Sequence, residues 1–418
     1  MSNEISPNHQ TPTIIYVVSQ YPAISHTFIL SEVNGLQSGG IRVQVASINQ
    51  PDRPFEHLTN IEQQAYKETV FVKVALKTRF LFYIFKSLII SPKGFFKSLG
   101  TTLKAAARYP HTLLHQLAYW LEAMVVADMV HSNGCQQLHA HFSTQGCTVA
   151  MLAAELTGIE FSFTVHGPDE FYHVDTQQLP QKFAAANFII CISDFAKSQV
   201  MKYTHFNDWD KLYINNLGVD SSLFHPTEKN NTIPKLLCVG RLVNAKGQGV
   251  LVQAAKKLVE RKIEFEVNFV GDGPDLENLQ AFVKQNALNN QVKFSGKVNH
   301  DQVQQLQRQA DIFVLPSFAE GIPIVLMEAM ASGTPCVTTH ITGIPELFTH
   351  DVNGLLVRPG NSTMLADALE LLINDKQRAS QLAEQALHTV RHQWCLHKSN
   401  QRLTQLFKRL LATPSTLP

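Results

Sequence analysis

Two glutamates stand in a stretch that is otherwise almost entirely apolar, between Asp311 and Gly333. The apolar run 312–315 ends at a proline and a polar loop, and a second apolar run follows, which predicts the order strand, loop, helix. Glu320 lies on the loop and Glu328 in the second helical turn, so both carboxylates are expected to face the space above the strand's end. An ionised carboxylate only accepts hydrogen bonds and therefore suits a pair of neighbouring hydroxyl groups. The alternative is a favourable acid near a helix N-terminus and a solvated residue on the helix surface.

Two cations follow another predicted strand. Arg241 and Lys246 lie on a short loop that begins at Gly240 and ends at Gly247, ahead of a predicted helix. A guanidinium and an ammonium beside the free N–H groups of a helix start match a diphosphate, and they reduce the need for Mg²⁺. A plain solvated loop is the alternative. A nucleotide sugar carries a diphosphate between two diols, so we predict such a co-substrate, with no further cofactor and no metal.

Further candidates lie at the ends of neighbouring strands. Gly271 and the segment that contains Val298 follow the next two predicted strands, where the backbone can approach a ligand closely. His166 follows directly on a strand of the N-terminal half, at the edge where open α/β sheets bind ligands. His139 and His141 are interpreted as polar residues at a strand end, because no carboxylate or cysteine at a suitable spacing supports a metal site.

These residues must be positioned by parallel sheets. The 418 residues suffice for two or three domains, and strands alternate with helices throughout, which predicts an α/β fold with two Rossmann-like domains facing across a cleft. The expected units are 1–225, 226–395 and a final helix and tail, 396–418, that packs back on the N-terminal domain. No Gly-x-Gly-x-x-Gly follows the first strand, unlike in dinucleotide-binding enzymes. The predicted strands are Thr13–Ser19, Ile41–Ile48, Gln137–Phe142, Phe161–Val165, Phe188–Ile192 and Leu212–Asn215, then Leu236–Val239, Glu266–Val270, Val292–Ser295, Ile312–Leu315, Pro335–Thr339 and Gly354–Val357.

Residues 69–121 differ from the rest of the chain because they contain no Asp or Glu but many basic, aromatic and aliphatic residues. Lys86 and Pro92 interrupt the apolar runs, so no stretch approaches the length of a membrane span. One interpretation is a basic, aromatic helix pair that lies on an anionic membrane surface or guides a lipid-linked acceptor. The other is a pair of ordinary domain helices whose lysines face water.

The overall composition excludes other partners and compartments. Lys and Arg number 35 against 34 Asp and Glu, so nucleic acid is not a predicted partner. The six cysteines are scattered without a Cys-x-x-Cys, which indicates buried free thiols in a reducing compartment. The N-terminal apolar run is too short for a signal core. A cytoplasmic protein is predicted, with peripheral binding to the inner face of the membrane.

Several motifs at fixed spacing resemble one family of enzymes. In the C-terminal half they are Val-Gly-Arg241-Leu-Val-x-x-Lys246-Gly, Val-Gly-Asp-Gly-Pro274, Phe-Ser-Gly296, Pro316-Ser, Glu320-Gly-x-Pro323, Glu328-Ala-Met-Ala-x-Gly333, Gly343-x-x-Glu346 and Asn353-Gly-x-Leu. This half resembles the retaining glycosyltransferases of the GT-B type, in the group 1 (family-4-type) branch that includes bacterial capsule, exopolysaccharide and lipopolysaccharide enzymes. Tyr21-Pro-x-x-Ser25-x-Thr-Phe-Ile is similar to the colanic-acid-like members, and His139-Ala-His-Phe142 and Thr164-x-His166-Gly fit more loosely.

The resemblance implies roles for individual residues. Arg241 and Lys246 would bind the donor diphosphate, and Glu328 would hold the ribose. Glu320 would hold the transferred sugar, and His166 would contact that sugar near the reacting carbon. Donor contacts are also implied for the backbone of Gly271, Val298, Gly321, Ile322, Pro323 and Ile324.

The first loop departs from the family pattern. Many relatives have Gly-Gly after the first strand, whereas this chain has Gln20-Tyr-Pro-Ala-Ile-Ser25-His26. Ser25, His26 and His141 are the candidates for acceptor contacts.

The predicted function is transfer of a hexose-type sugar, with retention and without a metal, to a glycan or lipid-linked acceptor in polysaccharide biosynthesis. Alternatives are a nucleotide-sugar epimerase of the same architecture and a non-catalytic nucleotide-sugar-binding subunit. The nucleobase, the sugar, the acceptor and the oligomeric state are left open by the sequence.

Overall fold

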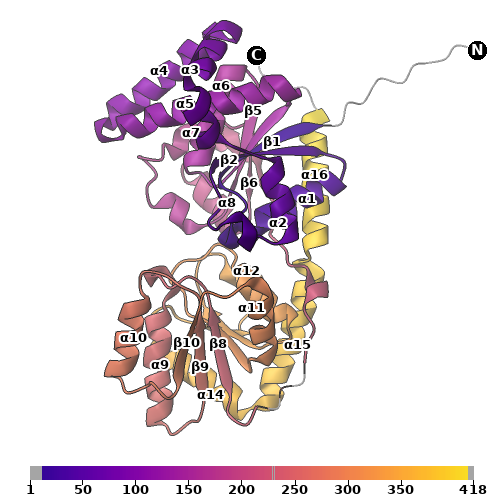
Figure 1. The fold of residues 1–418 in the computed structure, drawn as a ribbon. Coiled ribbons are helices and arrows are strands. Elements are labelled where there is room, and N and C mark those ends of the chain that lie inside the picture. The colour runs from indigo at the N-terminus through magenta and orange to yellow at the C-terminus, as the bar shows by residue number, and fades with distance from the viewer. Residues whose placement is uncertain (1–11, 228, 230, 413–418) are drawn as a thin grey trace, which may run out of the picture.

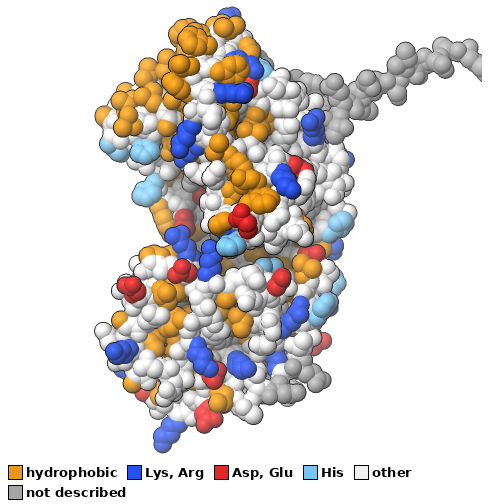
Figure 2. Space-filling view, in the orientation of Figure 1, with side chains coloured by type: hydrophobic (Ala, Val, Ile, Leu, Met, Phe, Trp, Pro, Cys, Tyr) orange, Lys and Arg blue, Asp and Glu red, His pale blue; other side chains and the backbone are white. Residues whose placement is uncertain are grey.

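Two parallel β-sheets, each packed against helices, form the protein in the computed structural model, which describes residues 12–227, 229 and 231–412 (Figure 1). The prediction of two Rossmann-like α/β domains is confirmed. Figure 2 shows a hollow between the two domains that is bordered by side chains of both charges. The carboxyl ends of parallel strands form one edge of a sheet, and residues far apart in sequence can meet there.

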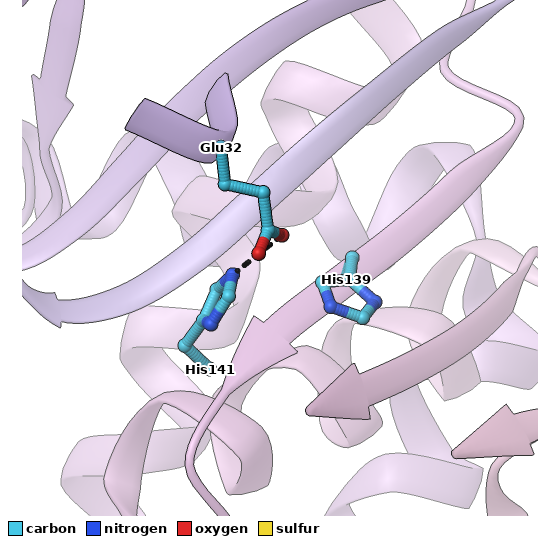
Figure 3. Close-up of side chains that lie close together, drawn as sticks. All are labelled: Glu32, His139 and His141. Atoms are coloured by element: carbon cyan, nitrogen blue, oxygen red, sulfur yellow. Dashed lines mark ion pairs between the residues drawn. The ribbon is translucent and has the colours of Figure 1, made fainter. Parts of the chain in front are cut away.

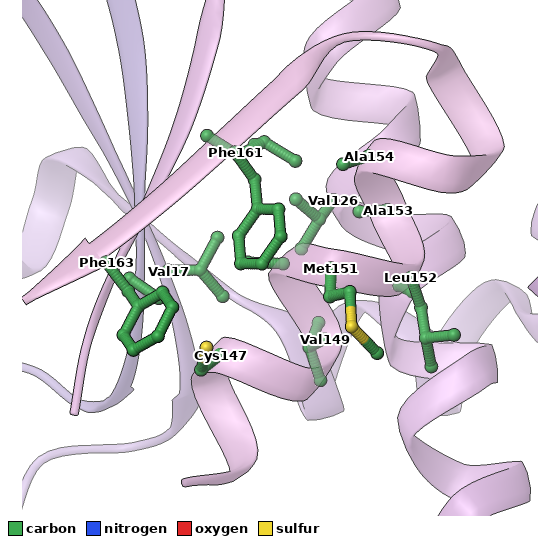
Figure 4. Packing of buried hydrophobic residues seen from close by; sticks show 14 of the residues in the cluster. Val17, Val126, Cys147, Val149, Met151, Leu152, Ala153, Ala154, Phe161 and Phe163 are labelled. Carbon is green, nitrogen blue, oxygen red and sulfur yellow. The ribbon is translucent and has the colours of Figure 1, made fainter. Parts of the chain in front are cut away.

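The N-terminal sheet has the strand order β3-β2-β1-β4-β5-β6-β7. Its strands are β1 Thr13–Gln20, β2 Arg42–Asn49, β3 Thr69–Phe71, β4 Gln137–His141, β5 Glu160–Val165, β6 Phe188–Cys191 and β7 Leu212–Ile214. The first six residues of β1 are buried because helices cover both faces of this central strand, and they therefore form a continuous apolar run. Figure 4 shows Val17, Phe161 and Phe163 of this sheet near Cys147 of helix α6.

The C-terminal sheet has the order β10-β9-β8-β11-β12-β13. Its strands are β8 Lys235–Val239, β9 Glu266–Val270, β10 Val292–Gly296, β11 Ile312–Leu315, β12 Cys336–Thr339 and β13 Leu355–Val357. All lie within one or two residues of their predicted bounds. The apolar runs are short and are punctuated by glycine, proline or polar loops, which is why their bounds could be predicted.

Sixteen α-helices lie in the described part of the chain. Those of the N-terminal half are α1 Thr27–Ser38, α2 Asn60–Glu68, α3 Val72–Ile90, α4 Pro92–Arg108, α5 Leu113–Asn133, α6 Gln145–Thr157, α7 Leu179–Ala185 and α8 Asp194–Met201. The remaining helices are α9 Gln248–Glu260, α10 Leu276–Gln285, α11 His300–Gln309, α12 Ile324–Ala331, α13 Ile344–Leu347, α14 Ser362–Asn374, α15 Lys376–Gln393 and α16 Leu396–Ala412. None of these helices is long and apolar enough to cross a membrane.

The segment 69–121 is not the expected pair of helices. Its first three residues form the edge strand β3, which pairs with β2 and is too short to be recognised by periodicity. Helices α3 and α4 follow, and the segment ends inside a third helix, α5. The second half of α5 is buried from Glu122 to Ala127, so this helix belongs to the domain core.

The last helix returns to the N-terminal domain. The backbone N–H of Val219 donates to the carbonyl of Trp394 at 2.9 Å, so the two connecting segments run side by side between the domains. Helix α16 then packs along α1, where a Cβ on Gly35 would lie 2.3 Å from the side chain of Asn400. The yellow helix beside α1 in Figure 1 is this element.

Candidate active site

The loops that follow β8, β9 and β11 are joined by backbone contacts. The N–H of Gly240 donates to the carbonyl of Val270 at 2.9 Å, and the N–H of Phe318 donates to the carbonyl of Ala245 at 2.7 Å. Gly247 has φ +63°, and a Cβ there would lie 2.2 Å from the Pro316 carbonyl oxygen, so only glycine fits. The loops predicted to bind the donor are therefore held together as one surface.

Lys246 and Glu320 meet at the centre of this surface. The Lys246 ammonium lies 2.7 and 2.9 Å from the two carboxylate oxygens of Glu320. The hydroxyl of Ser317 donates to the same carboxylate at 2.6 Å. Glu320 is 7% exposed, and its charge is therefore compensated by a cation and a hydroxyl donor.

Arg241 differs from Lys246 in its surroundings. It is exposed, and its guanidinium has no hydrogen-bond or ion-pair partner among the described residues. The carbonyl of Arg241 accepts from the side chain of Gln248 at 3.0 Å, which fixes the backbone of the loop while the guanidinium stays available for an anion.

Glu328 is buried, and few groups nearby compensate its negative charge. Gln307 donates a long hydrogen bond of 3.5 Å to its carboxylate, and the nearest ring nitrogen of His300 is 3.9 Å away. Burial raises the pKa of Glu328 to about 7, and the Gln307 hydrogen bond opposes that shift only in part. Glu328 was expected to be an ionised acceptor, whereas burial in the folded protein brings its pKa to about 7.

The remaining predicted donor residues lie around these side chains. Gly271 has φ +138°, and a Cβ there would lie 2.0 Å from the carbonyl of Gly240. Pro323 immediately precedes α12, at its N-cap position, and makes no side-chain hydrogen bond to the helix. Ile322 is buried, and Ile324 and Val298 are partly buried in the same apolar cluster.

The opposite domain approaches this surface at Gly321. A Cβ on Gly321 would lie 2.0 Å from the carbonyl oxygen of His166, so the two backbones are in direct contact. Nearby, the carboxylate of Glu346 accepts from the first two backbone N–H groups of α8, on Asp194 and Phe195, at 2.9 and 2.8 Å. A carboxylate from one domain thus caps a helix N-terminus of the other.

His166 ends a series of buried polar side chains. Its Nε2 lies 2.9 Å from Nδ1 of His141, and Nε2 of His141 lies 3.2 Å from a carboxylate oxygen of Glu32. The hydroxyl of Tyr16 donates to that same oxygen. Figure 3 shows Glu32 reaching from its helix to the ring of His141.

Glu32, His139 and His141 together form a cluster of potential metal ligands that was not predicted from the sequence. The missing carboxylate comes from α1, more than a hundred residues before the histidines. Both ring nitrogens of His139 are hydrogen-bonded, however, to Ser162 at 2.8 Å and to Thr164 at 2.9 Å. A metal bound by His139 would displace one of these hydroxyls, whereas Nε2 of His141 has no hydrogen-bond partner in the described structure.

Another buried carboxylate shapes the loop of His166. Glu170 accepts from the backbone N–H groups of His166 at 2.6 Å and Gly167 at 3.1 Å. The ammonium of Lys182 donates to the carbonyl of Ser143 at 2.6 Å beside it, and burial lowers the pKa of Lys182 to about 8. Neither Glu170 nor Lys182 was predicted to have a role, because the local sequence around a charged residue does not indicate whether the residue is buried.

The acceptor-side candidates differ in their exposure. His26 is partly exposed, and its ring lies 4.9 Å from that of Phe142, while burial lowers its pKa. The side chain of Ser25 lies outside the described structure. His141 is 0% exposed and lies beneath His166, so the expectation that it touches an acceptor is corrected to a supporting position.

The fold is similar to that of several solved structures. Sucrose-phosphate synthase from Thermosynechococcus elongatus has a TM-score of 0.75 at 16% identity and covers 96% of this chain and 100% of its own. Anabaena HepE in complex with UDP and glucose has a TM-score of 0.71 at 17% identity and covers 95% of this chain and 100% of its own. The architecture is therefore GT-B, as expected.

The family follows from sequence similarity. Residues 220–389 match the family described as Glycosyl transferases group 1. WcaL of Escherichia coli K12, named as a colanic acid biosynthesis glycosyltransferase, is 26% identical over 94% of this chain and 99% of its own length. AmsK of Erwinia amylovora, named as an amylovoran biosynthesis glycosyltransferase, is 31% identical over 48% of this chain and 51% of its own. These matches support the predicted family, with the similarity to the group 1 glycosyltransferases lying in residues 220–389.

Proposed function

We propose that the protein transfers a hexose-type sugar, with retention, from a nucleotide-diphosphate donor to a glycan or lipid-linked acceptor in exopolysaccharide biosynthesis. The observation that carries the proposal is the position of the Lys246–Glu320 ion pair. Glu320 directly precedes Gly321, and the backbone of Gly321 contacts that of His166 across the two domains. The names of WcaL and AmsK support an exopolysaccharide product.

Each side chain has a task that its surroundings allow. The unpaired guanidinium of Arg241 takes the diphosphate, and Lys246 shares its charge between Glu320 and the distal phosphate. Glu320 accepts hydrogen bonds from hydroxyls of the transferred sugar. Glu328 accepts from the ribose diol and is ionised by that binding, because hydroxyl donors favour the charged carboxylate.

The transfer step needs no protein nucleophile in this proposal. The bond between the anomeric carbon and the phosphate oxygen breaks, and the acceptor hydroxyl forms the new bond on the same face. The departing phosphate oxygen takes the proton of that hydroxyl. The two cations stabilise the negative charge that develops on the leaving nucleotide, which is electrostatic catalysis without a metal ion.

The test is transfer with a panel of UDP-, GDP- and ADP-sugars, in the presence and absence of EDTA. Arg241→Ala and Glu320→Gln are each expected to lose at least about 100-fold in kcat/KM, equivalent to about 3 kcal/mol of transition-state stabilisation. Lys256→Ala, at an exposed cation of α9, is the matched control and should retain activity. Undiminished turnover in both site variants contradicts the assignment.

The same assay separates the alternatives. An isomerised sugar formed from the donor alone identifies an epimerase, and nucleotide-sugar binding without any turnover identifies a binding subunit. Inverted product stereochemistry in the NMR spectrum refutes retention.

We further propose that α3, α4 and the start of α5 rest on an anionic membrane. About half of the large exposed apolar side chains in the described structure lie between residues 74 and 114, and Figure 2 shows apolar side chains gathered at this end of the molecule. Among them are Val74, Phe80, Leu81, Phe82, Phe85, Ile89, Ile90, Phe96, Leu103, Leu113 and Leu114. Exposed Lys77, Arg79, Lys93, Lys97, Lys104 and Arg108 surround them in a segment without acids. Lysines on a plain wet surface would not require exposed aromatic rings, so anionic lipid fits better.

Liposome co-sedimentation tests this surface. Binding is expected to rise with the fraction of anionic lipid and to fall with salt concentration. The double variant Phe85→Ser/Ile89→Ser should bind less than the wild type. Phe206→Ser is the control, because Phe206 is 74% exposed but lies outside α3 to α5. Equal sedimentation of the wild type, the Phe85/Ile89 double variant and the Phe206 variant refutes binding through this surface, and the absence of sedimentation with any lipid refutes membrane binding.

A further inference from the structure

The start of α9 and the length of α10 line a cavity of about 510 Å³ in the C-terminal domain. Figure 1 shows the two helices side by side. The loop from Gly240 to Gly247, which carries Lys246, forms a further wall, but neither Lys246 nor Glu320 lines the cavity. The cavity is therefore separate from the ion pair of the candidate active site. Its volume lies in the range of ~300–1,000 Å³ that is usual for ligand pockets.

Backbone hydrogen bonds fix the walls of this cavity. The N–H of Leu242 donates to the carbonyl of Asp272 at 3.0 Å, and the N–H of Asp275 donates back to the carbonyl of Leu242 at 3.1 Å. Phe318 is fixed in the same way by its bond to the Ala245 carbonyl at 2.7 Å. A cavity that is formed before its ligand arrives does not require the free energy of ordering its walls.

The lining of the cavity is rich in amides and carries almost no charge. The exposed side chains of Asn244, Gln253, Asn278 and Gln285 make no hydrogen bond to other described residues. Each amide offers two donors and an acceptor, which match neighbouring hydroxyl groups. The ring of Phe318 is 47% exposed at the rim, where it can lie against the C–H face of a sugar.

This lining selects among classes of ligand. Asp275 is the only charged residue among the described residues that line the cavity, so a phosphate or nucleotide would find no cation there. A wholly apolar ligand would cover the amides without giving them a partner, which is costly. A neutral sugar provides hydroxyls for the amides and an apolar face for the ring, and it satisfies both parts of the lining.

We propose that the cavity binds one or two sugar residues of a neutral glycan chain, outside the donor site. The inference rests on the proposed function only for the source of this glycan, because binding in the cavity does not require transfer. A chain held here stays on the enzyme between transfers, which raises its effective concentration at the active site.

Methyl NMR spectra measure this binding directly. Protein with ¹³C-labelled Leu and Val methyl groups is titrated with maltotetraose, cellotetraose and mannotetraose. Val243, Val250 and Leu279 line the cavity, and their signals are those missing from Val243→Ile, Val250→Ile and Leu279→Ile. At least one tetrasaccharide should shift these signals, with a Kd on the order of 1 mM and no dependence on salt concentration.

Variants on α10 and at the rim test the role of the lining. Asn278→Ala and Phe318→Ala should each weaken binding at least about fivefold, because each removes one polar or aromatic contact. Ala281→Trp should abolish it, since Ala281 is an exposed lining residue and a large side chain there fills the cavity. Gln280→Ala is the matched control, because Gln280 is an exposed amide of α10 outside the lining, and its Kd should stay within about twofold. The Tm of each variant shows whether it is folded.

Four outcomes overturn the proposal. The first is that none of the neutral tetrasaccharides shifts the three cavity signals, and the second is equal binding by the wild type and A281W. The third is displacement of the tetrasaccharide by UDP-, GDP- or ADP-sugars, which would place it in the donor site. The fourth is tighter binding of tetragalacturonate, an anionic glycan, than of every neutral one. Cavity binding in a protein that transfers no sugar refutes the proposed function alone, and transfer without cavity binding refutes this inference alone.

Discussion

Glu328→Gln is expected to stabilise the empty protein in a pH-dependent way. The wild-type carboxyl group has a pKa of about 7 in the folded state against an ordinary 4.5 in the unfolded chain, because burial disfavours its charge. The folded state therefore binds the proton more tightly. The resulting stabilisation is fully present below pH 4.5 and is lost as the pH rises through 7.

The two pKa values give the size of the effect. Between pH 5 and pH 8 the wild type should lose about 2–3 kcal/mol of unfolding free energy relative to the neutral glutamine variant. For a domain of this size that corresponds to a difference in Tm of roughly 5–10 °C. E328Q should thus be clearly more stable than the wild type at pH 8 and similar to it at pH 5.

Differential scanning calorimetry without nucleotide at a series of pH values measures this difference. Glu328→Asp is the control, since it keeps a carboxyl group and should keep a pH dependence like that of the wild type. A Tm difference between E328Q and the wild type that stays constant from pH 5 to 8 would refute the argument that burial governs this carboxylate. The same variant should lose donor binding, so a stabilising change would carry a functional cost.

Four further predictions concern the donor site and the domain contact. Donor affinity should increase by about 20-fold from pH 5.5 to 7.5 if ribose binding returns the Glu328 pKa to its ordinary value, and a flat profile in isothermal titration calorimetry contradicts this. Gly321→Ala places a Cβ 2.0 Å from the His166 carbonyl of the other domain, so kcat/KM should fall at least tenfold with an unchanged Tm. Gly247→Ala clashes within its own domain at φ +63° and should instead lower Tm, and the reverse pattern would be inconsistent with the proposed contacts. Glu346→Gln weakens the cap on α8, so the radius of gyration from X-ray scattering should increase, and an identical scattering curve argues against a role in closure.

Local patterns in the sequence were sufficient to predict the strands of both sheets and the position of the donor loops. Short apolar runs such as Ile312–Leu315 end at residues that cannot continue a strand, and parallel sheets place those ends at one edge. The glycines around Arg241 and Lys246 similarly indicated a tight loop before a helix. The edge strand β3 was missed, because three residues are too few for a periodicity.

Only the tertiary structure decided which side chains meet and what surrounds them. The sequence contained Glu32, His141 and His166, but their contacts span 25 and more than a hundred residues, and nothing in the local pattern distinguishes a buried acid from a solvated one. The same holds for the pairing of Lys246 with Glu320 and for the raised pKa of Glu328. Periodicity is a property of neighbouring residues, whereas burial and charge pairing depend on the packing of distant elements, and these set the protonation of the site.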